Sequence, residues 1–397
     1  MKREDLLDLW DRARRVVDGS EKQRGDGVRI PVDDYLDPAR LSRELDTLRR
    51  WPQLACAAAK LREPGDWIAV EILGVPLLVS RGMDGALRAF LNVCRHRGAV
   101  LADGCGEGRR AFTCPYHSWT YDTTGALIGR PHEDDFPHVP RDTASLVPVP
   151  VASRCGAIWV VPSQAESFDW DGYFGPMAES LEQIGYDARC VSGHQRAFPH
   201  PANWKLLVEG ALEVYHFQYA HRGTIAPYFS DNAVQVETFG RHQRVVLQRR
   251  SLLEAAAAHP QPTIAQFGRH ASLLNFFFPC TFLLWNGDHL TAFAMRPKTV
   301  DTAETDSFML VPPDAHAGRD AAHWDTNWDR FWAPLDEDYA LGASIQRGLR
   351  SGANRDLVYG TNEFPGPQFH RALEECLEGG PSDGAYRTVA IVPSQSK

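Results

Sequence analysis

The sequence predicts an α+β protein of two domains, in which a small antiparallel β domain precedes a larger domain built from an antiparallel sheet and helices. Three observations support this fold class. The chain of 397 residues is longer than a single hydrophobic core usually serves. Residues 66–90 contain short β-like runs joined by tight turns, and strand-like runs recur at residues 234–238, 244–247, 281–285, 290–295 and 307–311. Between these regions, residues 203–219 carry apolar side chains at helical spacing.

Composition and charge exclude several classes of function. The formal net charge of −9 argues against nucleic acid or an anionic membrane as a partner. The sequence lacks a run of about eighteen apolar residues, which predicts no membrane-spanning helix, and residues 1–5 do not resemble a signal peptide. Six scattered cysteines without paired spacing predict reduced thiols and a cytoplasmic location. These are Cys56, Cys105, Cys155, Cys190, Cys280 and Cys376.

The periodicity of the sequence predicts the individual elements in chain order. Helices are expected at residues 6–17 and from Asp37 to about residue 50. A hairpin is expected around Leu73 and Gly74, and residues 157–161 form a closing strand. We predict a helical N-terminal segment at 1–35 that packs on the larger domain, a β domain at 36–162 and the larger domain at 163–397.

Two Cys-His pairs in the predicted β domain form the strongest motif of the chain. Cys94 and His96 are followed, after seventeen residues, by Cys114 and His117. Two thiolates on one iron and two imidazoles on the other are the ligands of a Rieske-type [2Fe–2S] cluster. A structural zinc site is the alternative, but zinc fingers usually place both cysteines in one half of the motif, whereas each half here has one of each.

The flanks of both pairs, residues 92–98 and 114–121, resemble the Rieske motif of the large α subunits of ring-hydroxylating oxygenases. This resemblance implies a small antiparallel β Rieske domain that holds the cluster through Cys94, His96, Cys114 and His117.

A second group of candidate ligands lies on the predicted helix that Asn203 begins. Glu209, Glu213 and His216 follow one another at i, i+4 and i+7, and His221 comes five residues after His216. On an ideal helix a separation of five residues rotates the side chain by roughly 140°. The two imidazoles therefore meet at one metal only if the helix is distorted or ends near residue 220.

Residues 203–221 also resemble the mononuclear-iron motif of the same family, which implies that His216, His221 and a distant carboxylate bind Fe(II). Asp338 matches the position of this carboxylate best, with Asp336 and Glu337 as alternatives. The interpretation without a metal is a solvated cluster of acids at the start of a helix. Glu213 matches the acid, Asp or Glu, that the family places between the two metal centres. Gly210 departs from the Asn that many relatives carry.

The resemblance implies a catalytic domain with a helix-grip (START/Bet v1-like) fold, whose curled sheet surrounds a ligand cavity. It implies the terminal oxygenase component of a multicomponent enzyme that uses O2 and electrons from NAD(P)H. A separate reductase, with or without a ferredoxin, delivers the electrons, since no dinucleotide-binding fingerprint is evident. The expected reaction is hydroxylation, dihydroxylation or dealkylation of an aromatic or related small substrate, in a homotrimer with or without a small β subunit. The alternative is an electron carrier, or a protein that a structural zinc ion stabilises, without oxygenase activity.

One further segment and one group of aromatic residues are weaker candidates for a functional site. Residues 131–138 combine two histidines with three acids, but prolines and the lack of periodicity favour a solvated loop over a metal site. Several aromatic residues are candidates for an apolar substrate cavity, with ordinary core packing as the alternative. These are Phe217, Tyr228, Phe229, Phe276, Phe277 and Phe278.

Overall fold

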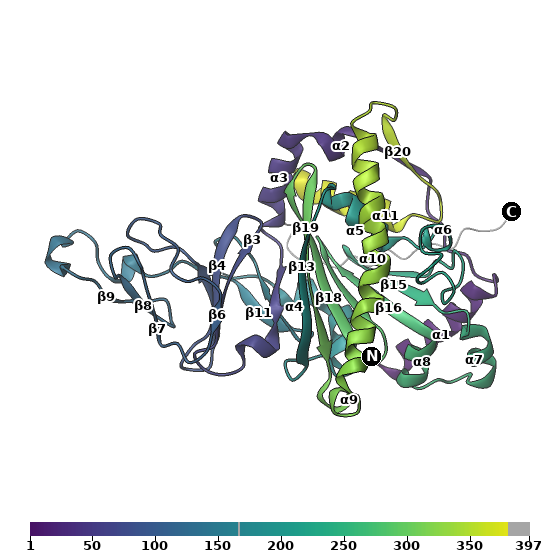
Figure 1. The fold of residues 1–397 in the computed structure, drawn as a ribbon, viewed down its shortest axis with the longest axis horizontal. Helices are drawn as coiled ribbons and strands as arrows, with labels where there is room; N and C mark the ends of the chain where they lie inside the picture. Colours follow the sequence, from purple (N-terminus) through teal and green to yellow (C-terminus); the bar gives the residue numbers. More distant parts are fainter. Residues whose placement is uncertain (166, 380–397) are drawn as a thin grey trace.

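Two β-sheet regions lie end to end along the long axis of the molecule, as the computed structural model shows for residues 1–165 and 167–379 (Figure 1). A small hydrophobic core surrounds Cys94 and Cys114, and a much larger core fills the rest of the molecule. Antiparallel sheets with covering helices, without a closed barrel among the described residues, confirm the predicted α+β class.

The small region consists of three antiparallel sheets. In the hairpin, Leu73 and Gly74 have φ values of 53° and 76°, as the predicted tight turn requires. The strands of the first sheet, in spatial order, are β10 (Pro148–Val149), β5 (Leu87–Leu91), β4 (Val75–Arg81), β3 (Trp67–Ile72) and β6 (Cys105–Gly106). The second sheet has β7 (Ala111–Thr113), β8 (Thr120–Asp122) and β9 (Leu127–Gly129), and the third has β11 (Val151–Arg154), β12 (Ala157–Val160) and β2 (Gln53–Ala57).

The large region is built on a seven-stranded antiparallel sheet. Its strands, in spatial order, are β13 (Val191–His200), β19 (Thr302–Val311), β18 (Leu290–Thr299), β17 (Thr281–Trp285), β16 (Ala271–Phe277), β15 (His242–Gln248) and β14 (Val236–Phe239). One face of this sheet packs against α4 (Trp170–Glu182), where Arg244 of β15 donates a hydrogen bond to Ser180. On the other face lie α5 (Trp204–Leu212), the long α10 (Ala321–Leu349) and α11 (Pro365–Gly379) (Figure 1).

The N-terminal residues pack on the large region. In α1 (Arg3–Val17), Trp10 Nε1 donates to the carbonyl of His259 at 3.1 Å, beside α7 (Leu252–Ala258). Strand β1 (Val28–Pro31) pairs with β20 (Asp356–Tyr359). Because α3 (Pro38–Leu48) also contacts α11, we propose that the domain boundary lies nearer residue 50 than residue 36. The remaining helices are α2 (Asp33–Leu36), α6 (Phe217–Ala220), α8 (Ile264–His270) and α9 (Pro313–Ala317), with 3-10 turns at Ala58–Leu61, Glu133–Asp135 and Asp142–Ala144.

Within the described residues, no helix is both long and apolar enough to cross a membrane. Residue 166 and residues 380–397, all in the predicted larger domain, lie outside the described residues.

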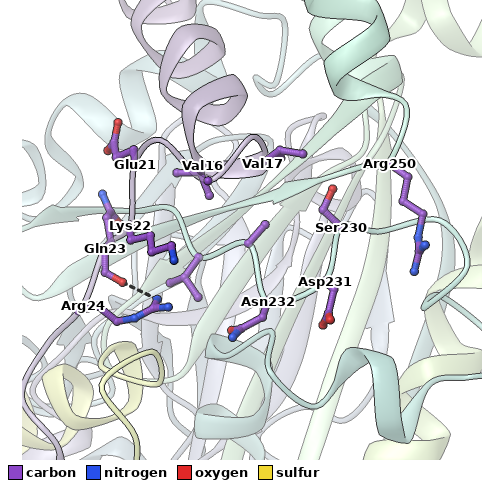
Figure 2. Close-up of a pocket in the computed structure, with 13 residues that line it drawn as sticks. Val16, Val17, Glu21, Lys22, Gln23, Arg24, Ser230, Asp231, Asn232 and Arg250 are labelled. Carbon is purple, nitrogen blue, oxygen red and sulfur yellow. Dashed lines mark hydrogen bonds between the residues drawn. The ribbon is translucent and has the colours of Figure 1, made fainter.

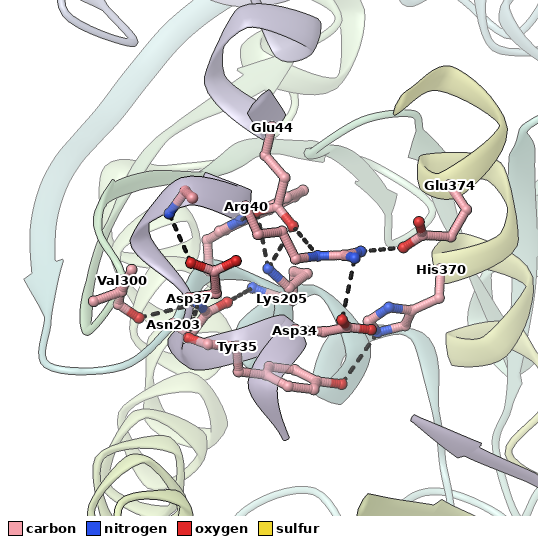
Figure 3. A network of polar contacts seen from close by, with 12 residues as sticks. Asp34, Tyr35, Asp37, Arg40, Glu44, Asn203, Lys205, Val300, His370 and Glu374 are labelled. Atoms are coloured by element: carbon pink, nitrogen blue, oxygen red, sulfur yellow. Dashed lines mark hydrogen bonds and ion pairs between the residues drawn. The ribbon is translucent and has the colours of Figure 1, made fainter. Parts of the chain in front are cut away.

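A buried ionic network fixes α5 against α3 and α11 (Figure 3). Lys205 Nζ lies 2.7 and 2.9 Å from the two carboxylate oxygens of Glu44, and neither side chain is more than 1% exposed. Arg40 pairs with Glu44 at 3.0 Å and with Glu374 of α11. One turn later, Glu209 accepts from Tyr35 at 2.8 Å and contacts Tyr359 and His370. Elements from both ends of the chain thus hold the helix that precedes the candidate iron ligands.

Replacement of Lys205 with Met is expected to destabilise the protein by about 3–5 kcal/mol, because it leaves Glu44 buried with only part of its compensating charge. Calorimetric unfolding would detect this as a lower transition temperature. The control is Lys298→Met, whose half-exposed partner Glu304 lies at 3.4 Å and whose loss should cost under about 1 kcal/mol. Equal effects of both substitutions would contradict the prediction.

Candidate metal centres

Two loops of the same construction present the Cys-His pairs. The amide of Gly98 donates to the carbonyl of Cys94 at 3.0 Å, and that of Ser118 donates to the carbonyl of Cys114 at 3.0 Å. Gly98 and Ser118 both adopt positive φ values, 79° and 57°, which turn the chain back after each pair. The two loops come together, so that the rings of His96 and His117 are 4.5 Å apart, centroid to centroid.

The environment of these four side chains fits a Rieske cluster. Cys94 and Cys114 are each 2% exposed and close enough to interact. The Nδ1 atoms of His96 and His117 are buried without a hydrogen-bond partner, which is costly for polar atoms unless something binds them. The thiols as one pair and the imidazoles as another match the two irons of the cluster.

Aromatic side chains cover the cluster site on the side of His96. Trp119 stacks on His96 at 4.8 Å, and Phe136 meets the same ring edge-on at 5.6 Å. Most residues of the loop at 131–138 are exposed, as predicted. Phe136, which packs on His96 and Trp119, holds this loop against the cluster site. Beside His117, by contrast, the side chain of Tyr116 is 61% exposed.

Removal of the Tyr121 hydroxyl is expected to lower the reduction potential of the cluster. This hydroxyl lies 3.4 Å from Cys94 Sγ and accepts a hydrogen bond from the Arg95 amide. A donor to a cluster sulfur stabilises the reduced, more negative state. One hydrogen bond of about 0.5–1.5 kcal/mol corresponds to roughly 20–60 mV for one electron. A redox titration of Tyr121→Phe should show this decrease, and an unchanged potential would exclude the hydrogen bond as a determinant.

The helix expected to continue through Glu213 and His216 is broken before both, so that prediction was wrong. Helix α5 ends at Leu212, and Glu213 is extended, with φ −113° and ψ 157°. The Glu213 carboxylate accepts from the amides of Tyr215 and His216, and these bonds replace the helical pattern. A separate short helix, α6, ends one residue before His221.

This break brings together the three predicted ligands of the mononuclear site. Their candidate donor atoms on His216, His221 and Asp338 lie within 4.8 Å of one another. The two Nε2 atoms are 3.0 Å apart, and Asp338 Oδ1 lies 3.4 Å from that of His216 and 3.1 Å from that of His221. Two imidazoles and one carboxylate on one side of a site are the ligand set of non-haem Fe(II) oxygenases.

Each histidine is oriented by a second carboxylate at its other nitrogen. Glu213 contacts Nδ1 of His216, and Glu337 Oε2 lies 2.7 Å from Nδ1 of His221. Glu337 also accepts from the hydroxyl of Thr224 at 2.7 Å. Carboxylates at Nδ1 direct Nε2 of both rings toward the shared centre, as outer partners of metal-binding histidines commonly do.

The charge of the site also fits a cation. Although burial opposes it, hydrogen bonds to Asp338 and Glu213 raise the pKa of His216 to about 10. Burial likewise opposes a charge on His221, but hydrogen bonding to Asp338 raises its pKa too. The surrounding carboxylates therefore favour positive charge here, which Fe(II) supplies when it displaces the protons.

The other candidates have different positions. Asp336, on the same helix, points to Arg196 at 3.5 Å and lies outside the ligand group. Tyr228 is 64% exposed. Phe276 packs against Phe369 of α11, whereas Phe277 packs against Phe174 of α4, because neighbouring strand residues face opposite sides.

A surface pocket of about 530 Å3 lies between the end of α1 and residues 230–234 (Figure 2). Arg250 on its rim donates to Gln218 and to the carbonyls of Ala226 and Phe229. The pocket thus adjoins the segment after α6 but contains none of the candidate ligands.

Comparisons with known proteins agree with this geometry. Residues 51–144 match the Rieske [2Fe-2S] domain, and residues 187–379 match the catalytic domain of the ring-hydroxylating α subunit. The chain is 30% identical over 308 residues to the carnitine monooxygenase oxygenase subunit of Acinetobacter baumannii, which covers 75% of this chain and 78% of the relative. It is 32% identical over 204 residues to the chloroplastic choline monooxygenase of Spinacia oleracea, covering 48% and 45%. A solved quaternary ammonium Rieske monooxygenase has the same fold, with a TM-score of 0.74, 21% identity and coverage of 87% and 94%.

The fold and the two centres define a terminal oxygenase that combines a Rieske [2Fe–2S] domain with a mononuclear iron domain. The chain belongs to the α subunits of the Rieske non-haem iron oxygenases, as its sequence motifs predict. Its cofactors are a [2Fe–2S] cluster and a mononuclear iron, and its reaction consumes O2 and electrons that a reductase supplies.

Proposed function

We propose that this enzyme is a monooxygenase of a quaternary ammonium compound. Iron is held by His216, His221 and Asp338, and the cluster by Cys94, His96, Cys114 and His117. The observation that carries the substrate class is the similarity to the carnitine monooxygenase subunit over most of both chains. The overall reaction converts a C–H bond, O2, two electrons and two protons into C–OH and water.

The chain's own residues do the positioning. Glu213 and Glu337 hold the two imidazoles at Nδ1, and Asp338 completes the set of three ligands. A metal bound by three protein ligands on one side would keep positions for O2 and substrate. When bound, the iron activates O2 there, and the cluster supplies an electron.

The test is a single turnover with 18O2. Protein with reduced cluster and iron is mixed with L-carnitine, glycine betaine or choline, and products are analysed by mass spectrometry. One 18O atom in an oxidised product, or in the aldehyde released after C–N cleavage, supports monooxygenation. Turnover of aromatic substrates alone would overturn the proposal. The predicted aromatic hydrocarbon catabolism and the cytoplasmic location stay predictions.

We further propose that the enzyme works as a homotrimer. The cluster loops and α6 lie at opposite ends of the molecule, so a neighbouring copy is needed to bring a cluster near each iron (Figure 1). Tyr116 beside His117 is 61% exposed, and Tyr215 and Tyr219 beside His216 are 45% and 60% exposed. Such aromatic residues are enriched in interfaces. In the solved quaternary ammonium monooxygenase, electrons pass between subunits.

A further inference from the structure

Arg249 faces the same side of the seven-stranded sheet as the candidate iron ligands. In β15, Gln243 donates to the carbonyl of Pro365 on α11, whereas Arg244 contacts α4 on the opposite face. Side chains alternate along a strand, and the chain stays paired through the bridge between Arg249 and Phe229. Arg249 therefore shares the face of Gln243, which α5, α10 and α11 cover.

Two phenylalanine rings connect Arg249 to the iron ligands. The guanidinium lies 5.9 Å from the centroid of the Phe229 ring, which in turn is 6.0 Å from the ring of Phe217. Phe217 is 5.1 Å from the ring of His216 and 5.7 Å from that of His221. The cation is thus separated from the candidate centre by a short aromatic surface.

The guanidinium of Arg249 has no ion pair and no hydrogen bond to any residue that the structure describes. Its Nε atom is fully buried, and burial lowers its pKa, with Arg330 as a secondary cause. Asp288 is the acid that most favours its charge, but the carboxylate of Asp288 is committed to His289 and His323, each at 2.8 Å. Partial burial of a cation without an ion pair or hydrogen bond costs free energy, unless a bound ligand neutralises the charge.

Two leucines on the face that Arg249 shares are incompletely covered. Leu247 of β15 and Leu284 of the central strand β17 are only half-buried, although both strands have neighbours on each side. Leu284 is paired with Leu274, which is paired with Val245, so it shares the face of Leu247 and Arg249. The covering helices therefore do not pack directly on this part of the sheet.

We propose that Arg249 binds a carboxylate of the substrate, which makes the preferred substrates zwitterions with a quaternary ammonium group and a carboxylate. This inference rests on the function proposed above and defines its substrate class. A guanidinium binds a carboxylate through two parallel hydrogen bonds. The ammonium end then lies toward the iron, where the faces of Phe217 and Phe229 attract a cation.

The test measures binding, independently of turnover. Calorimetric titrations of the anaerobic, iron-loaded protein compare L-carnitine and γ-butyrobetaine, which carry a carboxylate, with choline, which does not. Arg249→Gln should weaken binding of the first two about 10- to 100-fold, as expected for a hydrogen-bonded charge pair, and change choline binding less than about twofold. Arg249→Lys should restore part of the loss. The control is Arg269→Gln, an exposed residue at the end of α8, with cluster spectrum and iron content verified for each variant.

The outcomes separate the two proposals. If the wild type binds the carboxylate ligands and Arg249→Gln binds them equally well, or loses choline equally, the role of Arg249 is wrong and the proposed function stands. If the wild type binds none of the three compounds, the proposed function and its substrate class are both overturned.

Discussion

Asp338→Ala is expected to abolish turnover and to weaken iron binding at the mononuclear site, while the reduced cluster keeps its EPR signal. Asp338 Oδ1 is the oxygen that lies within 3.4 Å of both imidazole Nε2 atoms. Without it, two neutral imidazoles remain, and Fe(II) loses the carboxylate of the proposed ligand set. The loss of iron affinity should exceed the roughly 10- to 100-fold effect typical of outer-shell substitutions. Iron content after dialysis and EPR of the reduced protein measure the two effects separately.

Two neighbouring acids provide matched comparisons. Asp336→Ala, which removes an exposed partner of Arg196, should leave iron content and turnover close to the wild type. Glu337→Gln should keep some iron but bind it about 10- to 100-fold more weakly, because its carboxylate orients His221 without meeting the shared centre. An active Asp338→Ala enzyme beside an inactive Asp336→Ala enzyme would show that Asp336, and not Asp338, supplies the carboxylate ligand.

Much of the fold could be predicted from periodicity, and the strands that were missed have physical reasons. The N-terminal helix, the helix after Asp37 and the hairpin at Leu73 and Gly74 follow local rules, and the structure confirms them. Strand β13 was missed because it contains a glycine, Pro199 and several polar residues, which only an edge strand tolerates. Strand β16 is buried on both faces, so it lacks the alternation that identifies a strand.

The site could be predicted as a set of residue types but not as a geometry. The spacing of His216 and His221 indicates that the helix must be disturbed, but the break at Glu213 depends on a carboxylate that binds its own backbone. Glu337 was only an alternative ligand, because its distance from His221 depends on how α10 packs. No local pattern distinguishes Arg249 from the exposed Arg250 beside it. Only the register of β15 and the position of Phe229 show that Arg249 faces the side of the sheet on which the iron ligands lie.

Glu213→Gln is expected to keep both metals but to slow electron transfer from cluster to iron. We propose that Glu213 joins His216 of its own subunit to His117 of the adjacent subunit. Glutamine keeps the shape and loses the charge, so turnover should fall by at least the roughly 10- to 100-fold expected for an outer-shell partner. Stopped-flow oxidation of the reduced cluster measures the transfer itself. The control is Glu254→Gln, an exposed residue of α7, which should behave as the wild type.

The bridge requires that the cluster and the iron of a working pair belong to different subunits, and this can be tested by mixing two inactive variants. Cys114→Ser removes the cluster and keeps the iron site, whereas Asp338→Ala does the reverse, so each homotrimer is expected to be inactive. In mixed trimers, a Cys114→Ser subunit can receive electrons from an Asp338→Ala neighbour. Random equal mixing in a cyclic trimer makes about a quarter of the pairs competent, so about a quarter of the wild-type turnover should return. Light scattering verifies the trimer. Mixed assemblies that stay inactive, or a wild-type monomer with full activity, would eliminate both the bridge and transfer between subunits.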